Sequence, residues 1–393
     1  MSSASMIRHL QLGLQTTGPT QVPGSFQFID TQGDPVYAQT NPGRTPVDLQ
    51  RDDGLMAADE AGVKTGQLSF DTLLRGKGSG AGDGTTAVGG ELDELMDALT
   101  GFSGQHGEGT TVNDLSPAVA SFDLTSIANI ETGQTGTECA SGIMVETSSG
   151  YHAREIHTRS SNTVTVDRDL PEAPADAAVV YAATSWYFDG SNPDHSHIYA
   201  KLEGEDWRDA LIGCGVTGSL TIPEGGGRVS CSWALDANDV DDTTAEEDPT
   251  YSAATSATGI AARDCFFYID DTSTDLIDAS IQFGAAHAPK GSINGAQGAN
   301  GKVYTYNGSQ ISLRLYYTDA LWTLFSATAT IDIAFQLGTT PGNCWYIRVP
   351  AFQSTSIQKE KYNGVDIINI TGKDCRQSGR NGSLRMHCFA SAA

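Results

Sequence analysis

The strongest constraint on the fold is a stretch in which apolar residues alternate with small polar residues on both sides of a glycine cluster. It reads "GCGVTGSLTIPEGGGRVSCSWAL" and spans residues 213–235. Before the break at 223–227, the apolar residues Val216, Leu220 and Ile222 occupy even positions. After it, the apolar residues occupy odd positions, namely Val229, Cys231, Trp233 and Leu235. Successive side chains of a strand point to opposite faces, and glycines favour a turn. The stretch therefore predicts a β-hairpin, with Cys231 and Trp233 packed against the core or a neighbouring copy of the chain.

Similar alternation recurs along the chain and predicts a mainly β fold. The clearest runs contain Leu68, Phe70 and Leu74; Ile311, Leu313, Leu315 and Tyr317; Ile331, Ile333, Phe335 and Leu337; Trp345, Ile347 and Val349; and Leu384, Met386 and Cys388. Their alternate positions are mostly polar, which favours antiparallel sheets with one solvated face. Asn-Gly pairs, which suit tight hairpin turns, begin at Asn294, Asn300, Asn307, Asn363 and Asn381.

One segment has helical periodicity instead. "ELDELMDALTGF" (91–102) places Leu92, Leu95, Met96 and Leu99 on one stripe, and acidic residues in its first turn suit the helix dipole. Gly101 is expected to end this helix. The acidic stretch "EGEDWRDALIG" (203–213) is expected to form a helix or a turn.

The composition along the chain predicts three parts. Residues 1–60 are rich in Gln, Thr, Gly and Pro with little periodicity, so we expect an extended N-terminal arm. Residues 124–182 contain short alternating pieces and are expected to form an inserted small β module. Residues 61–123 and 183–393 are then the main β domain. We expect loss of residues 1–60 to weaken contacts between copies more than folding.

The net charge of −25 argues against tight nucleic-acid binding, because an acidic surface repels phosphate. The charge is uneven. Residues 301–393 hold nine Lys/Arg and five Asp/Glu, a net of +4, so residues 1–300 carry −29. This asymmetry suits head-to-tail contact between copies, and a solvated acidic surface explains it equally well.

Targeting signals and cysteine usage give further expectations. The N-terminal residues show no apolar region of a signal peptide, and no apolar run has membrane-spanning length. The seven dispersed cysteines form no CxxC motif, which favours free thiols in a reducing cytosol.

Two glycine-rich motifs are weak matches to nucleotide-binding loops. "GDGTTA" (82–87) fits G-x-G-x-x-A, but it lies in a long loop without the strand and immediate helix of a dinucleotide site. "GKGS", beginning at Gly76, lacks the upstream glycine and the following Ser/Thr of a P-loop. We interpret both as flexible loops and predict no cofactor.

The histidines are weak metal candidates. Asp194, His195 and His197 lie together, and the two histidines would share a strand face, so a metal site is conceivable. No third ligand is evident, since His152 and His157 belong to the other β unit. Surface histidines are the favoured interpretation, and no metal site is predicted.

Candidates for catalysis are weak too. Cys214 could serve as a nucleophile, but a cysteine among small residues beside a strand is more often a buried small hydrophobe. The acidic pairs Asp241-Asp242 and Glu246-Glu247 are consecutive in a solvated loop, whereas catalytic carboxylates face each other across a cleft. We predict no catalytic residue and expect that the protein is not an enzyme.

In their order along the chain, these segments resemble the tail tube (major tail) proteins of long-tailed bacteriophages. The resemblance rests on "GQLSFDTLLRG" with the helix after it, on the hairpin at 213–235, and on "SLRLYYTDALWTLFSATATIDIAFQLGTTPGNCWYIRVPAFQST" followed by "YNGVDIINITG". It covers roughly residues 60–100 and 199–393, and the stretch 145–183 resembles an inserted module of larger members. The ordered set carries the resemblance rather than any single motif.

The resemblance implies a tail-tube-like β-sandwich or half-barrel with a flanking α-helix. It implies a structural virion protein that self-assembles into stacked hexameric rings, the conduit for ejection of genome DNA. Six subunits per ring follow from the single copy of the pattern. The implied partners are copies of the chain, a tape-measure protein, a tail terminator and a baseplate or distal tail protein. DNA would pass without tight binding, no membrane would be contacted, and assembly would occur in the host cytoplasm.

A virion decoration or receptor-binding β protein is the alternative, and it would expose its strands instead of forming rings. An enzyme, such as an extracellular hydrolase, comes third. Arg376, Arg380 and Arg385 could form a local phosphate site. We expect them instead to meet acidic loops, such as 236–249, on an adjacent copy.

Overall fold

The computed structural model describes residues 9–15, 22–24, 26–40, 65–77, 92–101, 105–107, 109–127, 130–132, 140–188, 197–204, 207–241, 258–291, 299–327, 329–375 and 383–390. The chain is mainly β, as predicted, and antiparallel pairing dominates its sheet. Among the described residues, no helix combines the length and the apolar character that crossing a lipid bilayer requires.

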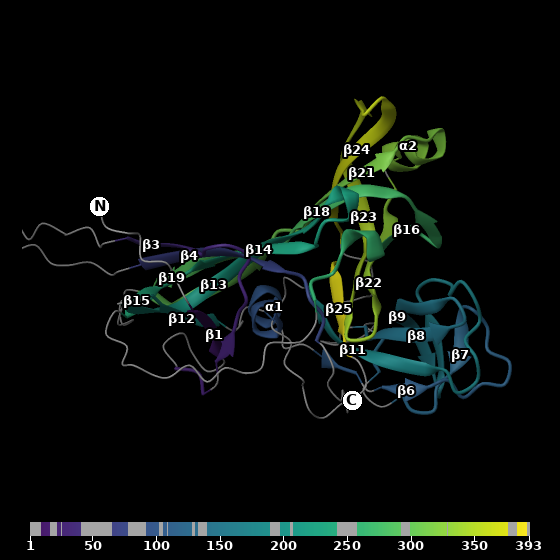
Figure 1. Cartoon of the computed structure of the whole chain (residues 1–393), viewed down its shortest axis with the longest axis horizontal. Coiled ribbons are helices and arrows are strands. Elements are labelled where there is room, and N and C mark those ends of the chain that lie inside the picture. Colours follow the sequence, from purple (N-terminus) through teal and green to yellow (C-terminus); the bar gives the residue numbers. More distant parts are fainter. Residues whose placement is uncertain are drawn as a thin grey trace, which may run out of the picture.

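Two layers of antiparallel strands share one core, and the long strand β13 (Arg208–Ile222) belongs to both (Figure 1). The first layer contains β2 (Gln27–Phe28), β1 (His9–Gln15), β12 (His197–Glu203), the first half of β13 and β15 (Asp239–Asp241). The second runs in the order β3 (Val36–Thr40), β4 (Thr65–Leu73), β14 (Ser230–Asp236), the second half of β13, β18 (Leu276–Gln282), β21 (Gln310–Tyr316), β24 (Val365–Asp374) and β23 (Asn343–Tyr362).

The second layer continues around the first half of β23. The further strands there are β22 (Ile331–Thr340), β16 (Cys265–Ile269), β17 (Thr272–Thr274) and β25 (Arg385–Phe389). A separate hairpin of β19 (Ala285–Gly291) and β20 (Ala299–Tyr306) lies beside β13.

The predicted hairpin is confirmed as β13 and β14. Leu220 pairs with Cys231 and Gly218 pairs with Trp233, so the apolar positions fall on one face. All seven of them are buried, whereas Thr221 and Ser232 on the other face are exposed. A 3-10 turn at residues 224–226 joins the strands, and Gly225 and Gly226 adopt φ values of 70° and 80° there. Glycine is needed because other residues rarely tolerate positive φ.

The predicted helix is confirmed as α1 (Asp93–Thr100), which ends at Gly101 with φ 77°. Its apolar stripe is buried against β1, β11, β12 and β13. A second helix, α2 (Asp319–Ser326), was not predicted, although Thr318 gives an N-cap signal by accepting the Leu321 N–H. The expectation of a helix or a turn at 203–213 is wrong from Arg208 onward, because these residues pair with β12 in a β-hairpin.

The N-terminal residues differ from the expected arm, because three of their strands pair within this chain. β1 pairs with β12 and β3 pairs with β4. Leu10, Leu12 and Ile29 are buried in the same core as the predicted hairpin. Leu14 and Tyr37 pack against this core as well. Leu10, Leu12 and Leu14 alternate with a period of two, which is a short strand signal within an otherwise polar segment.

A compact β unit lies to one side of the sheet (Figure 1). Its strands are β6 (Thr110–Thr111), β7 (Ser121–Asp123), β8 (Gly142–Thr147), β9 (Gly150–Ser160) and β10 (Thr163–Val166), with β5 (Gln105–His106) and β11 (Val179–Tyr187) leading back to the sheet. It has its own hydrophobic cluster, which includes Val112 and Phe122. Both residues precede 124, so this unit, hereafter the side module, includes residues before the predicted boundary.

The expectation of one solvated sheet face fails for β22, the first half of β23 and β25, where both faces are buried. The apolar face covers the main core. The opposite face packs against β8 and β9 of the side module, with Met144 and Ala153 meeting Ala334 and Tyr346. A face that is polar in sequence is therefore enclosed between two parts of the molecule.

Candidate functional site

A broad surface of uniform chemistry forms the outer face of the second layer. It consists of residues that alternate with the core positions of β4, β14, β13, β18, β21 and β24, and we call it the polar face. Its members are Gln67, Ser69, Asp71, Ser230, Ser232, Ala234, Asp236, Thr217, Ser219, Thr221, Asp278, Ser280, Gln282, Gln310, Ser312, Arg314, Asn369, Thr371 and Lys373. Hydroxyl and amide side chains dominate, so the surface is hydrated but carries little charge.

Strand register aligns these side chains in rows across the sheet. One row contains only hydroxyl residues on six adjacent strands, namely Ser230, Thr221, Ser280, Ser312, Thr371 and Ser356. The next row contains Asp71, Ser232, Ser219, Gln282, Gln310, Lys373 and Gln353. At the usual strand spacing, six strands span roughly 24 Å. The polar face is thus a broad surface rather than a cleft.

The cations of this face are few, and the one at its centre is neutralised. Arg314 donates to Glu224 at 2.7 Å and also to Asp278, and its guanidinium stacks on the Tyr362 ring at 4.6 Å. Lys373 is exposed at the margin. Phosphate binding depends on cations that displace counterions. The polar face therefore does not have the composition of a nucleic-acid-binding surface.

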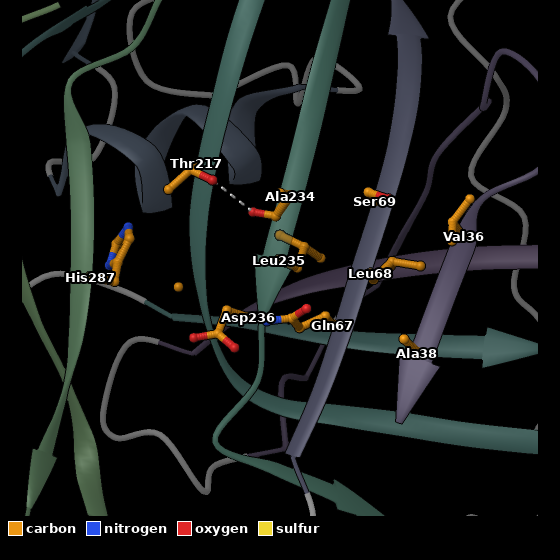
Figure 2. Close-up of a pocket in the computed structure, with 11 residues that line it drawn as sticks. Val36, Ala38, Gln67, Leu68, Ser69, Thr217, Ala234, Leu235, Asp236 and His287 are labelled. Atoms are coloured by element: carbon orange, nitrogen blue, oxygen red, sulfur yellow. Dashed lines mark hydrogen bonds between the residues drawn. The ribbon is translucent and has the colours of Figure 1, made fainter. Parts of the chain in front are cut away.

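A depression of about 460 Å3 lies where the polar face meets β3 and β19 (Figure 2). Its floor contains the small residues Ala38, Ser69 and Ala234, and His287 of β19 stands at the side near Gly215 and Thr217 (Figure 2). Small residues on a flat sheet let another backbone approach closely. The depression is suited to a packed protein segment or a small polar molecule.

The two ionisable residues at this depression make structural bonds. His287 Nε2 donates to the Val216 carbonyl oxygen at 2.7 Å. The Asp236 carboxylate accepts from Lys302 Nζ, whose side chain is 1% exposed. A nucleophile paired with a base, as acyl or phosphoryl transfer requires, is not found among these lining residues.

The densest ionic chemistry lies elsewhere, between the side module and the sheet. We call this set the Glu155 cluster; it contains Glu155, Asp167, Asp332, Arg168, Arg348 and Arg385, with His387 and Tyr346 beside them. Glu155 Oε1 accepts from Arg348 at 2.6 Å and from Arg385 at 2.5 Å. Three carboxylates thus face three guanidiniums, so the cluster is balanced if His387 is neutral.

Electrostatics in the Glu155 cluster favour the charged forms of Glu155 and Arg348. Burial by itself would raise the pKa of Glu155, but Arg385 and Arg348 hold that pKa well below its usual value. Burial opposes the charge on Arg348, yet Glu155, Asp167 and Asp332 raise its pKa well above the usual value. Because Glu155 and Arg385 are fully buried, no substrate reaches them as the structure stands. The cluster therefore joins two parts of the fold.

The cluster overturns the prediction for Arg385. This residue is 0% exposed and pairs with Glu155, so it is not free to meet phosphate or an adjacent copy. Its partner lies 230 residues away in sequence, which a local charge count does not show. Arg376 and Arg380 fall outside the described residues, as do residues 242–249 of the predicted acidic loop.

The histidine candidates that the structure describes are not brought together as a metal site. His197 is buried, and its Nε2 accepts the Lys302 backbone N–H at 3.0 Å. His152 interacts with Ser149 at 3.1 Å in the side module. Asp194 and His195 lie outside the described residues. Among the described side chains, no group of three or more His, Cys, Asp or Glu is arranged to hold a metal ion.

The remaining candidates have structural surroundings where the chain is described. Cys214 is buried in the main core, and burial raises the pKa of its thiol to about 12, as expected for a small hydrophobe rather than a nucleophile. Gly76 packs against the backbone of Gly342, and the lysine after it is buried in the protein interior. Residues 82–87 lie outside the described residues, as do Asp242, Glu246 and Glu247.

The sequence predicted the polar-face strands β4, β13, β14 and β21, but it did not predict β18 or the Glu155 cluster. The signal for the polar face is local, because polar residues fill every second position. The only signal for the cluster was the presence of arginines in otherwise apolar strands, at Arg348 and Arg385. Comparison of the chain with models of known protein families and with curated protein sequences finds no significant match to either.

Proposed function

We propose that this protein is a structural subunit of a bacteriophage tail tube, which assembles through its sheet into stacked hexameric rings. The observation that carries the proposal is the polar face, a broad neutral surface backed by a continuous apolar core. The two layers joined by β13, with α1 at their side, support the expected sandwich-like subunit. The ordered resemblance of the sequence to tail tube proteins supports the same function.

The two ends of the second layer support assembly by strand pairing. β3 pairs only with β4 among the described strands, and its residues Val36–Thr40 carry no charge. At the opposite end, residues 355–362 of β23 pair with β24 on one side only. The β23 edge carries Lys359, Glu360 and Lys361, whereas the β3 edge is uncharged and unpaired among the described strands, the kind of edge that tends to accept another strand. Pairing between copies would join the polar faces into one continuous wall.

Such a wall suits a conduit for DNA. A duplex moving past the polar face would meet hydroxyl and amide groups, with Arg314 neutralised by carboxylates. The acidic body of the chain adds weak repulsion of phosphate. DNA would then pass without being retained.

Negative-stain electron microscopy of the purified protein tests the proposal. We expect rings or tubes, and we expect Ala38→Lys to abolish them, because an exposed lysine on β3 blocks strand addition at that edge. Circular dichroism should show the same folded spectrum for this variant and for the native chain.

The matched control is Leu115→Lys, which adds one lysine at an apolar residue that is 91% exposed on the side module. It should leave assembly unchanged. Isolated monomers or trimers of the native chain over a wide concentration range would argue against a tube subunit. They would favour a decoration or receptor-binding protein.

A further inference from the structure

A lysine and an aspartate face each other in the interior where the end of β4 meets the start of α1. Lys77 Nζ donates to Asp93 Oδ2 at 2.6 Å. The two side chains are only 3% and 14% exposed. In sequence, residues 78–92 lie between them. Because both side chains are largely buried, little water surrounds the amine and the carboxyl group.

An aromatic residue covers the pair. The Trp186 ring lies 5.5 Å from Lys77 Nζ, and Trp186 is fully buried. Its indole N–H donates to Asp97 Oδ1 at 2.6 Å, one helical turn after Asp93. The ring is therefore fixed by the helix that carries the aspartate, so amine, carboxyl and ring form one ordered site.

A neutral acid is available on the same helical turn. Glu94 Oε2 is buried without a hydrogen-bond partner. Burial, followed by the charges of Asp97 and Asp93, raises the pKa of Glu94 to about 8. Its carboxyl group is therefore mostly protonated at neutral pH, and it can donate a proton to a leaving group and take one back.

We propose that Lys77 and Asp93 condense into an intramolecular amide, with loss of one water molecule. An oxygen 2.6 Å from Nζ places the carboxyl carbon about 3–3.5 Å from the nitrogen, which meets the distance requirement of a near-attack arrangement. The bond joins β4 to α1 covalently. It goes beyond the proposed function and does not depend on it.

The step balances without an oxidant or a co-reactant. A proton passes from the ammonium to the carboxylate along their hydrogen bond. The nitrogen lone pair attacks Cγ of Asp93. Glu94 protonates the departing hydroxyl and accepts a proton from the nitrogen. The C–O bond breaks, water leaves, and the pair has no net charge before or after.

Mass spectrometry of the full-length chain tests the bond. We expect the intact mass to fall short of the calculated mass by one water. A protease that cleaves after glutamate separates residues 61–91 from the tripeptide 92–94. In the native protein, these two peptides should remain joined through Lys77 and Asp93.

Three variants sharpen the test. Lys77→Arg keeps the positive charge but removes the nucleophilic amine, so it should show the full mass and release the tripeptide. Asp93→Asn should still form the bond, now with loss of ammonia instead of water. Glu94→Gln should lower the linked fraction, because the amide cannot shuttle the proton.

An internal comparison is Lys302 with Asp236, a second contacting pair whose aspartate is 52% exposed. It should stay unlinked, because its carboxylate is open to solvent rather than enclosed. A native chain of full calculated mass that releases the tripeptide 92–94 would overturn the proposal and leave Lys77–Asp93 as an ordinary ion pair. That result would not bear on assembly.

Discussion

At the scale of single residues, Trp233 shows how a sequence pattern becomes packing. Its ring fills the space that Gly218 leaves open on the paired strand, where a Cβ atom would lie 2.9 Å from the ring. Its Nε1 donates to Thr72 Oγ1 at 2.9 Å. The residue therefore contributes apolar burial, close cross-strand contact and a satisfied polar group at once.

We expect Trp233→Ala to lower the free energy of unfolding by about 3–5 kcal/mol, because it leaves a cavity in the core. Chemical denaturation of the native chain and the variant measures the difference. Ser232→Ala, on the exposed face of the same strand, is the control and should change stability by less than about 0.5 kcal/mol. Equal stability of Trp233→Ala and the native chain would place the ring outside the core.

Glu155 is the residue through which acid should destabilise the protein. Its pKa in the folded state lies well below the value in an unfolded chain. Its stabilising contribution is thus complete above the unfolded pKa and is lost as the pH falls toward the folded pKa. Glu155→Gln should lower the free energy of unfolding by about 3–5 kcal/mol at pH 7, because Arg348 and Arg385 lose their shared anion.

Thermal unfolding between pH 7 and pH 3 checks this prediction. The native chain should lose stability below about pH 5, and Glu155→Gln should depend less on pH in that range. A second variant combining Glu155→Gln with Arg385→Met restores the charge balance and should recover part of the loss. If Glu155→Gln matches the native chain at pH 7, the ions do not hold the side module on the sheet.

At the scale of elements, β1 differs strongly from its prediction, because the sequence suggested an extended arm and the structure shows a core strand. It pairs along its whole length with β12 and inserts Leu10 and Leu12 into the main core. Gln15 fixes its end, because its Oε1 accepts the Gly213 N–H at 3.0 Å. We expected residues 1–60 to matter more for assembly than for folding. For β1 we now expect the opposite, because this strand packs into the core of its own chain.

Deletion of residues 1–16 should destabilise the subunit by several kcal/mol, since each buried leucine contributes about 1.5–3 kcal/mol. Thermal melting followed by circular dichroism measures the effect. Deletion of residues 1–8, which leaves β1 intact, is the matched control and should melt close to the native chain. Identical melting of both deletions would show that β1 does not stabilise the fold.

At the scale of the whole molecule, charge separates into two environments. The Glu155 cluster buries balanced ions between the side module and the sheet. The polar face exposes mainly neutral groups, and the chain as a whole carries −25. Arg348 and Arg385 are thereby enclosed and do not contribute to the polar face.

Fluorescence anisotropy with duplex DNA at two salt concentrations tests the proposed passage of DNA without tight binding. The Kd of the native chain for DNA should be larger than the values of about 10⁻⁴–10⁻⁶ M that are typical of non-specific binders. A triple variant that places lysines in one row of the polar face should gain salt-sensitive DNA binding. Its substitutions are Ser280→Lys, Ser312→Lys and Thr371→Lys. Micromolar, salt-sensitive binding by the native chain would contradict the proposed passage of DNA.

The sequence by itself determined the strands β4, β13, β14, β21, β22, the first half of β23 and β25, with the side that faces the main core, and it determined α1. These features depend on local periods of two and about 3.6 residues. The outer side of β4, β14 and β21 could likewise be read as polar. The helix α2 was missed because its eight residues lie between two strong strand patterns. Its capping residue Thr318 was the available signal.

Only the tertiary structure decided which polar residues meet solvent. Arg348, Arg385 and Gln336 alternate with core residues just as Ser280 and Ser312 do, yet the first three are buried and the latter two line an outer face. The difference arises because the side module covers one part of the sheet and not the other. A period of two fixes that a strand has two faces, but the packing of distant segments fixes what each face contacts.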